Sequence, residues 1–501
     1  MITQAPIPVS DKAGRREWLG LLLLVLPTLI VSMDMTVTYL ALPVLSAALR
    51  PGPTELLWIT DIFGFLEAGL LIVMGSLGDR IGLRKLLLTG ATAFTLASVL
   101  AAFSTSAIGL IVARGIMGIA GASLLPTVLS LIRNLFHDAR QRTFAMGLYT
   151  TCFSAGTMLG PIFGGLLLDR FGWPSVFLMP VPLILLLLGF APFLLPEFRQ
   201  RNAKPIDGIS AILLMGAILP IVYGGKQLAQ SGSPLVPVFC LLTGGLLAWQ
   251  FVRRQRRIDN PLIQLELFSD ARFNAAIAAL FVALFSWSGV FLFIGQYLQS
   301  VAGVNSFSAG LWMLPGAAGS VLLCMLAPVA VRYISRDRMI AIGLLVMSAG
   351  IAGLCFLTPT SLGLLAITSF FLSGGCGLTV TLGIDLVVAS APPEKAGAAA
   401  GLSETSTGFG GSFGVAALGS IGTAVYRQAM TAHQASAAAR STIGAAIQEA
   451  QHRQDPALLD FARSTFLHGV HITALVAALF IFATAVLQLM LTFSRNKQSH
   501  E

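Results

Sequence analysis

Ionisable side chains interrupt several of the long apolar stretches in this sequence. They comprise acids and one arginine, at Asp34, Asp61, Glu67, Arg114, Asp385 and Glu404. A charge is costly in hydrocarbon, so ionisable residues at membrane depth face the protein interior or a water-filled space and often serve ion or proton movement. Because burial favours the neutral form of a carboxylate and a nearby cation favours its ionised form, these acids suit the exchange of a proton for a cation.

Asp34 and Arg114 each have a structural alternative. Asp34 lies well inside the first apolar stretch, with Thr38 one helical turn away on the same face. It either exchanges a proton for a cation or is a structural aspartate permanently paired with Arg114. Arg114 either faces the bundle interior, where it needs a carboxylate partner, or extends from the first turns of its helix to the membrane interface.

The other acids differ in their depth. Asp61 lies near one end of the second apolar stretch, where a hydrated mouth and a binding role are both open, and Glu67 lies deeper. Asp385 is a candidate gate residue near the cytoplasmic end of its stretch. Glu404 lies in a glycine-rich segment, Gly401 to Gly414, that can pack closely around a ligand. None of the histidines lies at the centre of an apolar stretch, so carboxylates should carry the protons.

The composition places the chain in a membrane. Hydrophobic residues make up 55% of it and charged residues 11%, and the mean hydropathy is +0.83, which leaves too little polar surface for a soluble domain. The net charge of +9 comes from short basic clusters, without the continuous basic and aromatic face that nucleic acid requires. The cysteines show no paired or metal-ligand spacing, and no clustered nucleophile or metal set indicates an enzyme. We therefore expect no enzyme activity, no cofactor, no metal and no nucleic-acid partner.

Runs of roughly 20 apolar residues, the length that crosses a membrane, predict about fourteen helical spans. They fall near residues 18–47, 55–77, 84–103, 107–132, 141–168, 174–196, 207–227, 234–253, 272–300, 306–332, 338–358, 362–390, 396–426 and 466–493. The predicted organisation is a tail (1–17), an N-terminal six-helix bundle (18–198), a two-helix membrane linker (199–258), a C-terminal six-helix bundle (259–493) and a second tail (494–501).

Basic residues predict the orientation in the membrane. They cluster at alternate connections, which are therefore cytoplasmic, and both termini fall on the same side. The exception is the external loop 427–464, which contains Arg440, Arg453 and Arg463. Long loops cross membranes largely regardless of their charge, so this loop does not change the assignment. Its alanine-rich part from Ala435 to Gln451 is a candidate helical hairpin.

A stripe of glycines marks the fifth span. Gly156, Gly160 and Gly164 are four residues apart, so on a helix they form one nearly bare face that a partner helix can approach closely. Pro161 removes a backbone donor and bends the helix, and Gly165 leaves room around the neighbouring carbonyls. The spacing alone also occurs in ordinary small-residue packing. Together with the proline, the stretch resembles motif C of drug/proton antiporters in the major facilitator superfamily.

Other stretches resemble further motifs of that superfamily. The start of the fourth span, from Leu110 to Gly118, is similar to motif B, whose arginine, here Arg114, is thought to influence proton transfer. The stretch from Ser32 to Pro43 resembles motif D1 of the fourteen-helix branch and contains Asp34. The connection between spans two and three resembles motif A, a cytoplasmic gate latch, through Gly75, Gly78, Asp79, Arg80, Gly82 and Arg84.

The resemblance implies a fold and a function. The fold is an all-α polytopic membrane protein with two six-helix bundles, two linker helices and a central cavity near the bilayer midplane. The function is that of a proton-coupled multidrug efflux antiporter in the bacterial inner membrane. It would export lipophilic cations such as quaternary ammonium biocides, dyes and methyl viologen-like dications, and thereby support antimicrobial resistance.

The resemblance also implies the partners and the site. The partners are cationic drugs, protons and membrane lipid, and we expect a monomer. Arg114 would be the proton-relay partner of the cation-binding and proton-coupling acids Asp34, Asp61, Glu67 and Glu404. Quaternary ammonium exporters of this branch carry a further acid one turn after the position of Glu404, where this chain has Gly408. The alternative function is a proton-coupled exporter of an endogenous metabolite, lipid or amino acid.

Overall fold

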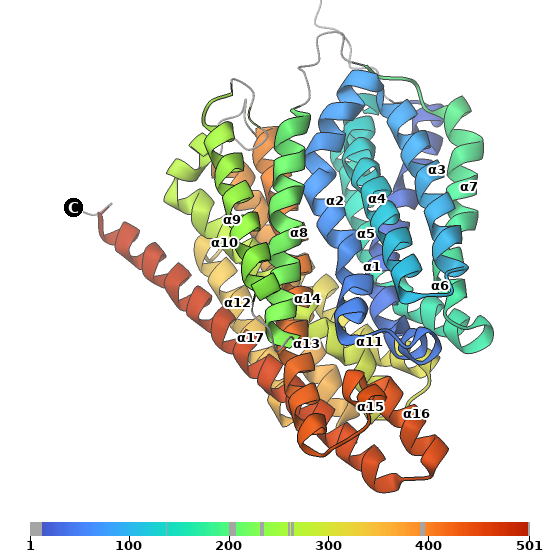
Figure 1. The fold of residues 1–501 in the computed structure, drawn as a ribbon. Coiled ribbons are helices and arrows are strands. Elements are labelled where there is room, and N and C mark those ends of the chain that lie inside the picture. The colour runs from blue at the N-terminus through green and yellow to red at the C-terminus, as the bar shows by residue number, and fades with distance from the viewer. Residues whose placement is uncertain are drawn as a thin grey trace, which may run out of the picture.

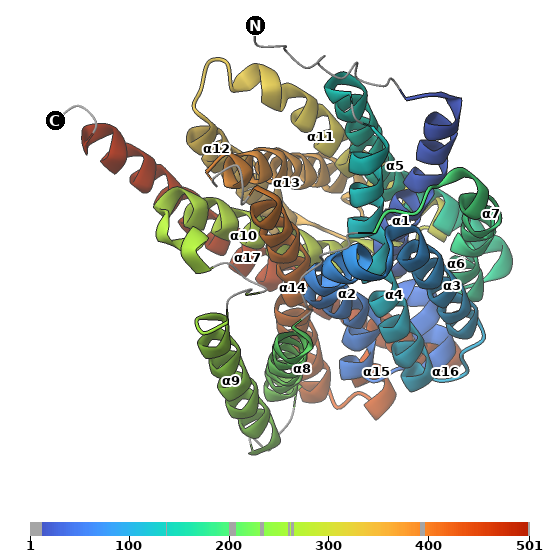
Figure 2. The ribbon, with the colours of Figure 1, turned by 90° about the horizontal axis from the view of Figure 1, so that it is seen from above.

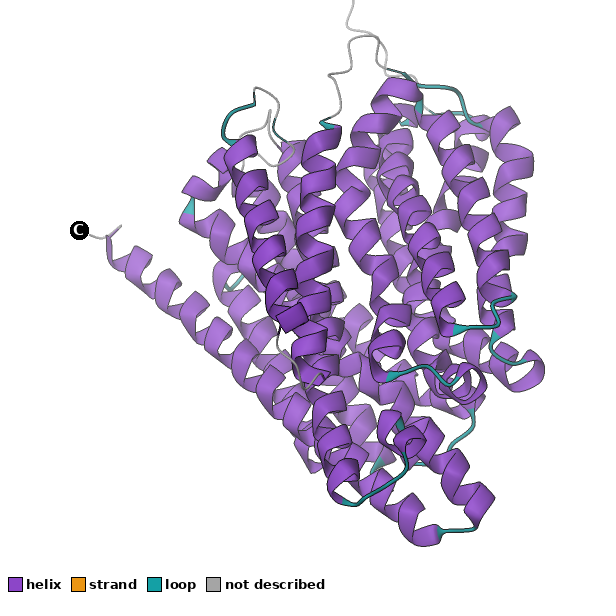
Figure 3. Ribbon diagram, in the orientation of Figure 1, coloured by secondary structure: helices purple, strands orange, loops and turns teal. Residues whose placement is uncertain are grey.

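The computed structural model describes residues 13–136, 138–199, 207–230, 235–258, 261, 265–390 and 396–498. Within these ranges the regular structure is helical and contains no strand (Figure 3). The prediction of an all-α polytopic protein is therefore confirmed. Residues 1–12 and 499–501, which belong to the predicted tails, lie outside the described residues.

The N-terminal helices form one bundle around a common core. They are α1 (Arg15–Leu49), α2 (Pro53–Ile81), α3 (Leu83–Ala102), α4 (Ala107–Leu135), α5 (Ala139–Phe171), α6 (Pro174–Leu178) and α7 (Pro180–Leu194). The predicted sixth span is divided into α6 and α7, each of which begins with a proline at a position where its missing N–H does no harm. The core of this bundle runs from Leu21 to Leu195.

The linker and the C-terminal bundle follow. Their helices are α8 (Gly208–Gln230), α9 (Leu235–Gln255), α10 (Ala271–Gln296), α11 (Ser306–Ala330), α12 (Arg336–Gly353), α13 (Leu362–Ser390), α14 (Ala396–Ala432), α15 (Ala437–Ser441), α16 (Ile443–Arg453) and α17 (Pro456–Gln498). A π-helical turn, Tyr297–Val301, prolongs α10. The core of the C-terminal bundle also takes in Val37 to Leu42 of α1 without Thr38, so the two bundles share buried contacts.

In the part of the chain that the structure describes, twelve helices are long and apolar enough to cross a membrane by length and composition. This set counts α6 and α7 as one span, and it omits α2 and α8. Both omitted helices run alongside the spanning ones (Figure 1), and α8 is apolar from Gly208 to Gly224. The described residues therefore support twelve of the predicted spans by length and composition. The two other predicted spans, near 55–77 and 207–227, correspond to the helices α2 and α8.

The last connection is more helical than predicted. α14 continues to Ala432, α15 and α16 occupy most of the candidate hairpin, and α17 begins at Pro456 rather than near residue 466. The earlier start follows from a local cap, because Asp455 Oδ1 accepts the backbone N–H of Leu458 at 3.0 Å. α15 and α16 lie at the bottom of Figure 1, opposite the end where α2 passes into α3.

The linker helices lie against the line where the two bundles meet. Seen from above, α8 and α9 lie to one side of the molecule, with α8 beside α14 and α2 (Figure 2). A small apolar cluster joins the three helices through Phe65 of α2, Ile218 and Val222 of α8, and Ala416 of α14. α8 therefore covers the boundary between the bundles on this side.

Candidate functional site

Asp34 of α1 and Arg114 of α4 form a buried ion pair. Arg114 Nη1 lies 2.5 Å from Asp34 Oδ2, and the side chains are 2% (Arg114) and 1% (Asp34) exposed. Arg114 thus faces the bundle interior and has the expected carboxylate partner. The alternative in which it reaches the membrane interface is wrong.

A backbone carbonyl and two aromatic rings also hold the guanidinium. Arg114 Nε donates to the carbonyl of Ile59 at 3.2 Å. Its Cζ lies 4.8 Å from the ring centroid of Phe63 and 5.9 Å from that of Phe177. Cation–ring contacts of this kind are worth about 0.5–2 kcal/mol. Arg114 therefore keeps partners even when the charge on Asp34 changes.

The second carboxylate oxygen of Asp34 is left without a donor. Asp34 Oδ1 is buried and has no hydrogen-bond partner. The Thr38 hydroxyl, expected on the same face, donates to the backbone carbonyl of Asp34 at 2.8 Å and not to its carboxylate. Buried polar atoms without a partner are rare in folded proteins, and this oxygen is free to accept a hydrogen bond from water or to take up a proton.

Asp61 and Glu67 both lie on α2 and are 2% and 7% exposed. Asp61 is thus buried in this structure, and its binding role stays a prediction. Glu67 Oε1 is buried without a hydrogen-bond partner and points at Gly121 of α4, where an added Cβ would lie 3.4 Å from it. Charge interactions connect Glu67 with Asp34 and Arg114, so these acids share one neighbourhood.

Small residues bring α2 and α14 together at the boundary between the bundles. Three glycines lie so close to the facing helix that a Cβ atom added to them would come within 2.5–2.8 Å of a side chain there. The contacting pairs are Leu57 with Gly419, Gly64 with Ser412, and Ala68 with Gly408. Each step along α2 is matched by an equal step back along α14, so the helices are antiparallel in one register. At Gly408 the contact with Ala68 leaves no room for an acidic side chain.

Glu404 lies one turn before Gly408 on α14, and its side chain is exposed. It nevertheless lies near groups of the N-terminal bundle, because charge interactions connect it with Glu67 of α2 and with Tyr149 of α5. An accessible carboxylate with neighbours from both bundles faces the space between them. The structure therefore brings Glu404 and Glu67 together, whereas Asp34 is held by Arg114.

An aromatic cluster lies at the same boundary. The rings of Tyr39 on α1 and Phe291 on α10 meet edge to face with their centroids 5.7 Å apart. Trp287 stacks on Phe291 at 4.5 Å, and its indole N–H donates to the Ser373 hydroxyl at 3.1 Å. Flat aromatic rings that belong to both bundles suit flat cations, because a cation over a ring face is attracted to it.

The connection resembling motif A is held by an acid that the sequence analysis did not identify. The Glu197 carboxylate accepts the backbone N–H of Arg84 at 3.0 Å and of Lys85 at 3.2 Å, and so caps α3. Gly82 precedes α3 with φ +111°, and an added Cβ would lie 2.5 Å from Glu197 Oε1. Glu197 is the lone acid in a basic segment, Leu195 to Lys204, and this contrast is the signal that identifies it.

The other residues of this connection lie as follows. The Arg84 guanidinium donates to the carbonyls of Pro192 and Leu195 at 3.2 and 3.0 Å. The Arg80 side chain is exposed, while its carbonyl accepts from Arg199 at 2.7 Å. Gly75 and Gly78 face Pro126 and Leu83, respectively. The side chain of Asp79 lies outside the described residues.

The glycine stripe of α5 packs on α1 near Asp34. An added Cβ would lie 2.6 Å from the Leu29 carbonyl at Gly156, 3.0 Å from the Met33 carbonyl at Gly160, and 2.6 Å from Val37 at Gly164. Backbone approach this close requires residues without side chains. The α1 segment that carries Asp34 is therefore seated directly on the stripe.

The end of the stripe touches the C-terminal bundle. An added Cβ on Gly165 would lie 2.5 Å from the Ser306 carbonyl, and Pro161 faces Gly310 of α11. Asp169, a further residue missed in the sequence, accepts the backbone N–H groups of Ser306 and Phe307 at 3.1 and 3.0 Å and so caps α11. α5 therefore connects the helix of Asp34 with the opposite bundle.

Asp385 forms a surface ion pair. Its carboxylate lies 2.9 Å from Arg336 Nε, and the side chains of Asp385 and Arg336 are 52% and 45% exposed, respectively. The pair joins the end of α13 to the start of α12. Asp385 is thus exposed and paired with Arg336, and its gating role stays a prediction.

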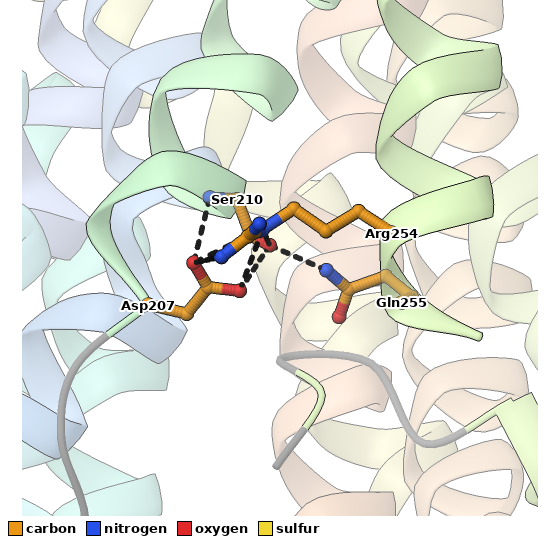
Figure 4. Close-up of polar contacts among 4 residues, drawn as sticks. All are labelled: Asp207, Ser210, Arg254 and Gln255. Atoms are coloured by element: carbon orange, nitrogen blue, oxygen red, sulfur yellow. Dashed lines mark hydrogen bonds and ion pairs between the residues drawn. The ribbon is translucent and has the colours of Figure 1, made fainter. Parts of the chain in front are cut away.

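A polar cluster closes the two linker helices at one end (Figure 4). Arg254 Nη2 lies 2.9 Å from Asp207 Oδ1, the Ser210 hydroxyl bonds the same carboxylate, and the Gln255 amide donates to Ser210 at 2.7 Å. Burial by itself raises the pKa of Asp207, but hydrogen bonds from Arg254 and Ser210 outweigh it and hold the pKa below its ordinary value. The cluster ties the start of α8 to the end of α9.

Several bacterial proteins resemble this chain over most of its length. The multidrug efflux pump LfrA of Mycolicibacterium smegmatis is 40% identical over 95% of this chain and 97% of its own length. The methyl viologen resistance protein SmvA of Salmonella typhimurium is 34% identical over 94% of this chain and 98% of its own length. The tetracenomycin C resistance and export protein of Streptomyces glaucescens is 30% identical over 83% of this chain and 77% of its own length.

Solved structures share the fold at low sequence identity. A bacterial homolog of the human lysosomal transporter Spinster superposes with a TM-score of 0.67 at 17% identity, over 95% of this chain and 98% of that one. The nucleoside transporter NupG superposes with a TM-score of 0.61 at 13% identity, over 93% and 99%. The family model of the Major Facilitator Superfamily matches residues 24–415. The chain belongs to the Major Facilitator Superfamily and is a multi-pass membrane transporter, not an enzyme.

Proposed function

We propose that this transporter exports lipophilic cations in exchange for protons. The substrates are quaternary ammonium biocides, dyes and dications of the methyl viologen type. The observation that carries the proposal is a group of acids, in which Asp34 is held by Arg114, Glu67 interacts with both of them, and Glu404 interacts with Glu67. The relatives named for multidrug efflux and methyl viologen resistance support the substrate class.

Proton coupling acts through Asp34 in this proposal. Protonation of Asp34 removes its attraction to Arg114, which keeps its contacts with Ile59 and Phe63. α1 and α4 then repack, and the glycine stripe passes the change from α1 to α5 and on to α11. Asp61 belongs to the same coupling group. The motif A residues, the α5 stripe and Asp385 serve the accompanying movement of the bundles as gating elements.

Charge balance sets the coupling ratio. Moving one positive charge outward against a potential that is negative inside costs roughly 2.3 kcal/mol per 100 mV, so exchange of one proton for one monovalent cation is electrically neutral. A pH difference of one unit supplies about 1.4 kcal/mol per proton. Export of a dication needs a second proton to remain neutral.

The transporter acts as a monomer in the bacterial inner membrane, with both termini in the cytoplasm and the loop between α14 and α17 outside.

Inverted vesicles containing the transporter test the proposal. Ethidium uptake into these vesicles should follow an imposed proton gradient and collapse on addition of a protonophore. The Asp34→Asn variant at equal expression should lose the gradient-driven uptake, because its amide cannot exchange a proton. Undiminished uptake driven by ATP in the presence of the protonophore would contradict the antiporter. Proton-driven transport of an endogenous metabolite without any cation transport would favour the alternative function.

A further inference from the structure

Glu67 lacks a hydrogen-bond partner for one carboxylate oxygen. Its side chain is 7% exposed, and the buried Oε1 points at the bare surface of Gly121 on α4, which offers no donor. The cation with which Glu67 interacts is Arg114, and that guanidinium is already bound to Asp34 at 2.5 Å. A buried carboxylate in this situation is poorly compensated until a further cation or a proton arrives.

The helix register brings Glu404 to Glu67 from the opposite bundle. Ala68, the next residue of α2, contacts Gly408 of α14. Glu404 lies one turn further along α14, so the two acids are about 7–8 Å apart along the helix axes, within the reach of two glutamate side chains. A charge interaction between them agrees with this spacing. Glu404 is exposed, which leaves one side of the pair open to a ligand.

Two carboxylates at this separation suit a ligand with two positive charges. A rigid organic dication places one charge near each acid, whereas a monocation satisfies only one of them. Asp34 is less suited to this task because Arg114 neutralises it. Tyr149 of α5 interacts electrostatically with both acids, which agrees with their lying near each other.

We propose that Glu67 and Glu404 form a two-carboxylate substrate site for organic dications, with one acid supplied by each bundle. The inference rests on the proposed cation export and adds the residues that select doubly charged substrates. A site built from α2 and α14 exists only while these helices keep their register. Movement of the bundles therefore separates the acids and releases the dication.

Binding to the purified transporter in lipid nanodiscs tests the site with methyl viologen as the dication and ethidium as the monocation. Glu67→Gln should weaken methyl viologen binding about tenfold or more and ethidium binding by less than about threefold, because it removes one of two charges. Glu404→Gln should weaken both ligands, since the accessible acid is the one that a monocation reaches. Glu55→Gln, at the start of α2, is the matched control and should change neither affinity.

Further measurements separate this inference from the proposed function. Vesicle transport in Glu67→Gln should lose far more of its methyl viologen export than of its proton-driven ethidium export. Equal changes for the two ligands, or no change, with an active parent transporter would overturn the two-carboxylate site and leave cation export intact. Absence of proton-driven cation transport in the parent would overturn both.

A second variant guards against a folding defect. Glu67→Asp keeps the charge and withdraws it by one methylene, so it should weaken methyl viologen binding more than ethidium binding while the thermal unfolding midpoint stays that of the parent. A selective loss in Glu67→Asp supports the site even where Glu67→Gln fails to fold. An unchanged ligand preference in this variant would count against it.

Discussion

The N-terminal and C-terminal bundles handle charge in opposite ways. In the N-terminal bundle, Asp34 and Arg114 are withdrawn from water and bound to each other, and Glu67 is 7% exposed. In the C-terminal bundle, Glu404 is exposed, and Asp385 pairs with Arg336 at the surface. Both bundles belong to one superfamily fold, so this difference reflects the side chains that each one carries.

Charges in the two bundles contribute different free energies. Loss of one partner from a buried ion pair leaves an uncompensated charge and costs about 3–5 kcal/mol, whereas exposed pairs contribute about 0–1 kcal/mol. The free energy of changing a protonation state in the N-terminal bundle is therefore large enough to shift a conformational equilibrium. Charges in the C-terminal bundle are better placed to meet a ligand that arrives from water.

Arg114→Met should have the largest effect. The substitution leaves the Asp34 carboxylate buried without its partner, which predicts a loss of about 3–5 kcal/mol in stability and the loss of proton-driven transport. Thermal unfolding of the purified variant and ethidium uptake in vesicles measure the two effects. Arg332→Met, in an exposed connection of the C-terminal bundle, is the control and should resemble the parent. A stable and active Arg114→Met transporter would remove the energetic difference between the bundles.

Gly160→Leu should follow in size. Its side chain would be forced against the Met33 carbonyl and Thr36 of α1, and overpacking of this kind costs about 1–3 kcal/mol. Because the contact seats the helix of Asp34, transport should fall further than the amount of protein in the membrane. Gly189→Leu on α7, where nothing lies within 4 Å of an added Cβ, is the matched control. Equal drug resistance in both variants at equal expression would show that transport does not depend on the glycine stripe.

Asp207→Asn tests the linker that lies against both bundles. The pKa of Asp207 is lowered by Arg254 and Ser210, so its ionised form stabilises the fold above the ordinary value of 3.8, and this stabilisation is lost as the pH falls through the lowered value. The side chain of Arg254 is 33% exposed, so water screens the ion pair and limits the loss to about 1 kcal/mol. Thermal unfolding at neutral pH should show a lower midpoint for the variant than for the parent, and the difference should close as the pH falls below 3.8 and through the lowered pKa of Asp207. A difference in stability between variant and parent that widens as the pH falls would contradict this prediction.

Arg336→Gln should have the smallest effect. The ion pair with Asp385 is about half exposed on both sides, so its loss should cost less than about 1 kcal/mol and vary with salt. Ethidium uptake and thermal unfolding of the variant, compared with Asp385→Asn, measure the contribution. A loss of transport at unchanged stability in both variants would show that Asp385 is the gate residue and would bring surface charge of the C-terminal bundle into the transport cycle.

The sequence determined the membrane class, most of the helices and the set of candidate acids, of which Asp34, Asp61 and Glu67 are buried while Asp385 and Glu404 are exposed. These properties depend on residues close together in the chain, since a run of apolar side chains defines a span and a charge inside it must be explained. The sequence left the pairing of Asp34 with Arg114 as one of two alternatives. It predicted the bare face of α5 from glycines that are four residues apart. Helix ends were less predictable: α17 begins at Pro456 because a single side chain, Asp455, caps it.

Only the tertiary structure decided which of these groups meet. The caps by Glu197 on α3 and by Asp169 on α11 join residues more than a hundred positions apart, and no local pattern encodes them. The register of α2 on α14 is set by contacts of small residues such as Ala68 with Gly408, and that register brings Glu67 to Glu404 while Arg114 holds Asp34. Hydropathy and periodicity specify the face of a helix, but the partner of that face depends on how all the helices pack together.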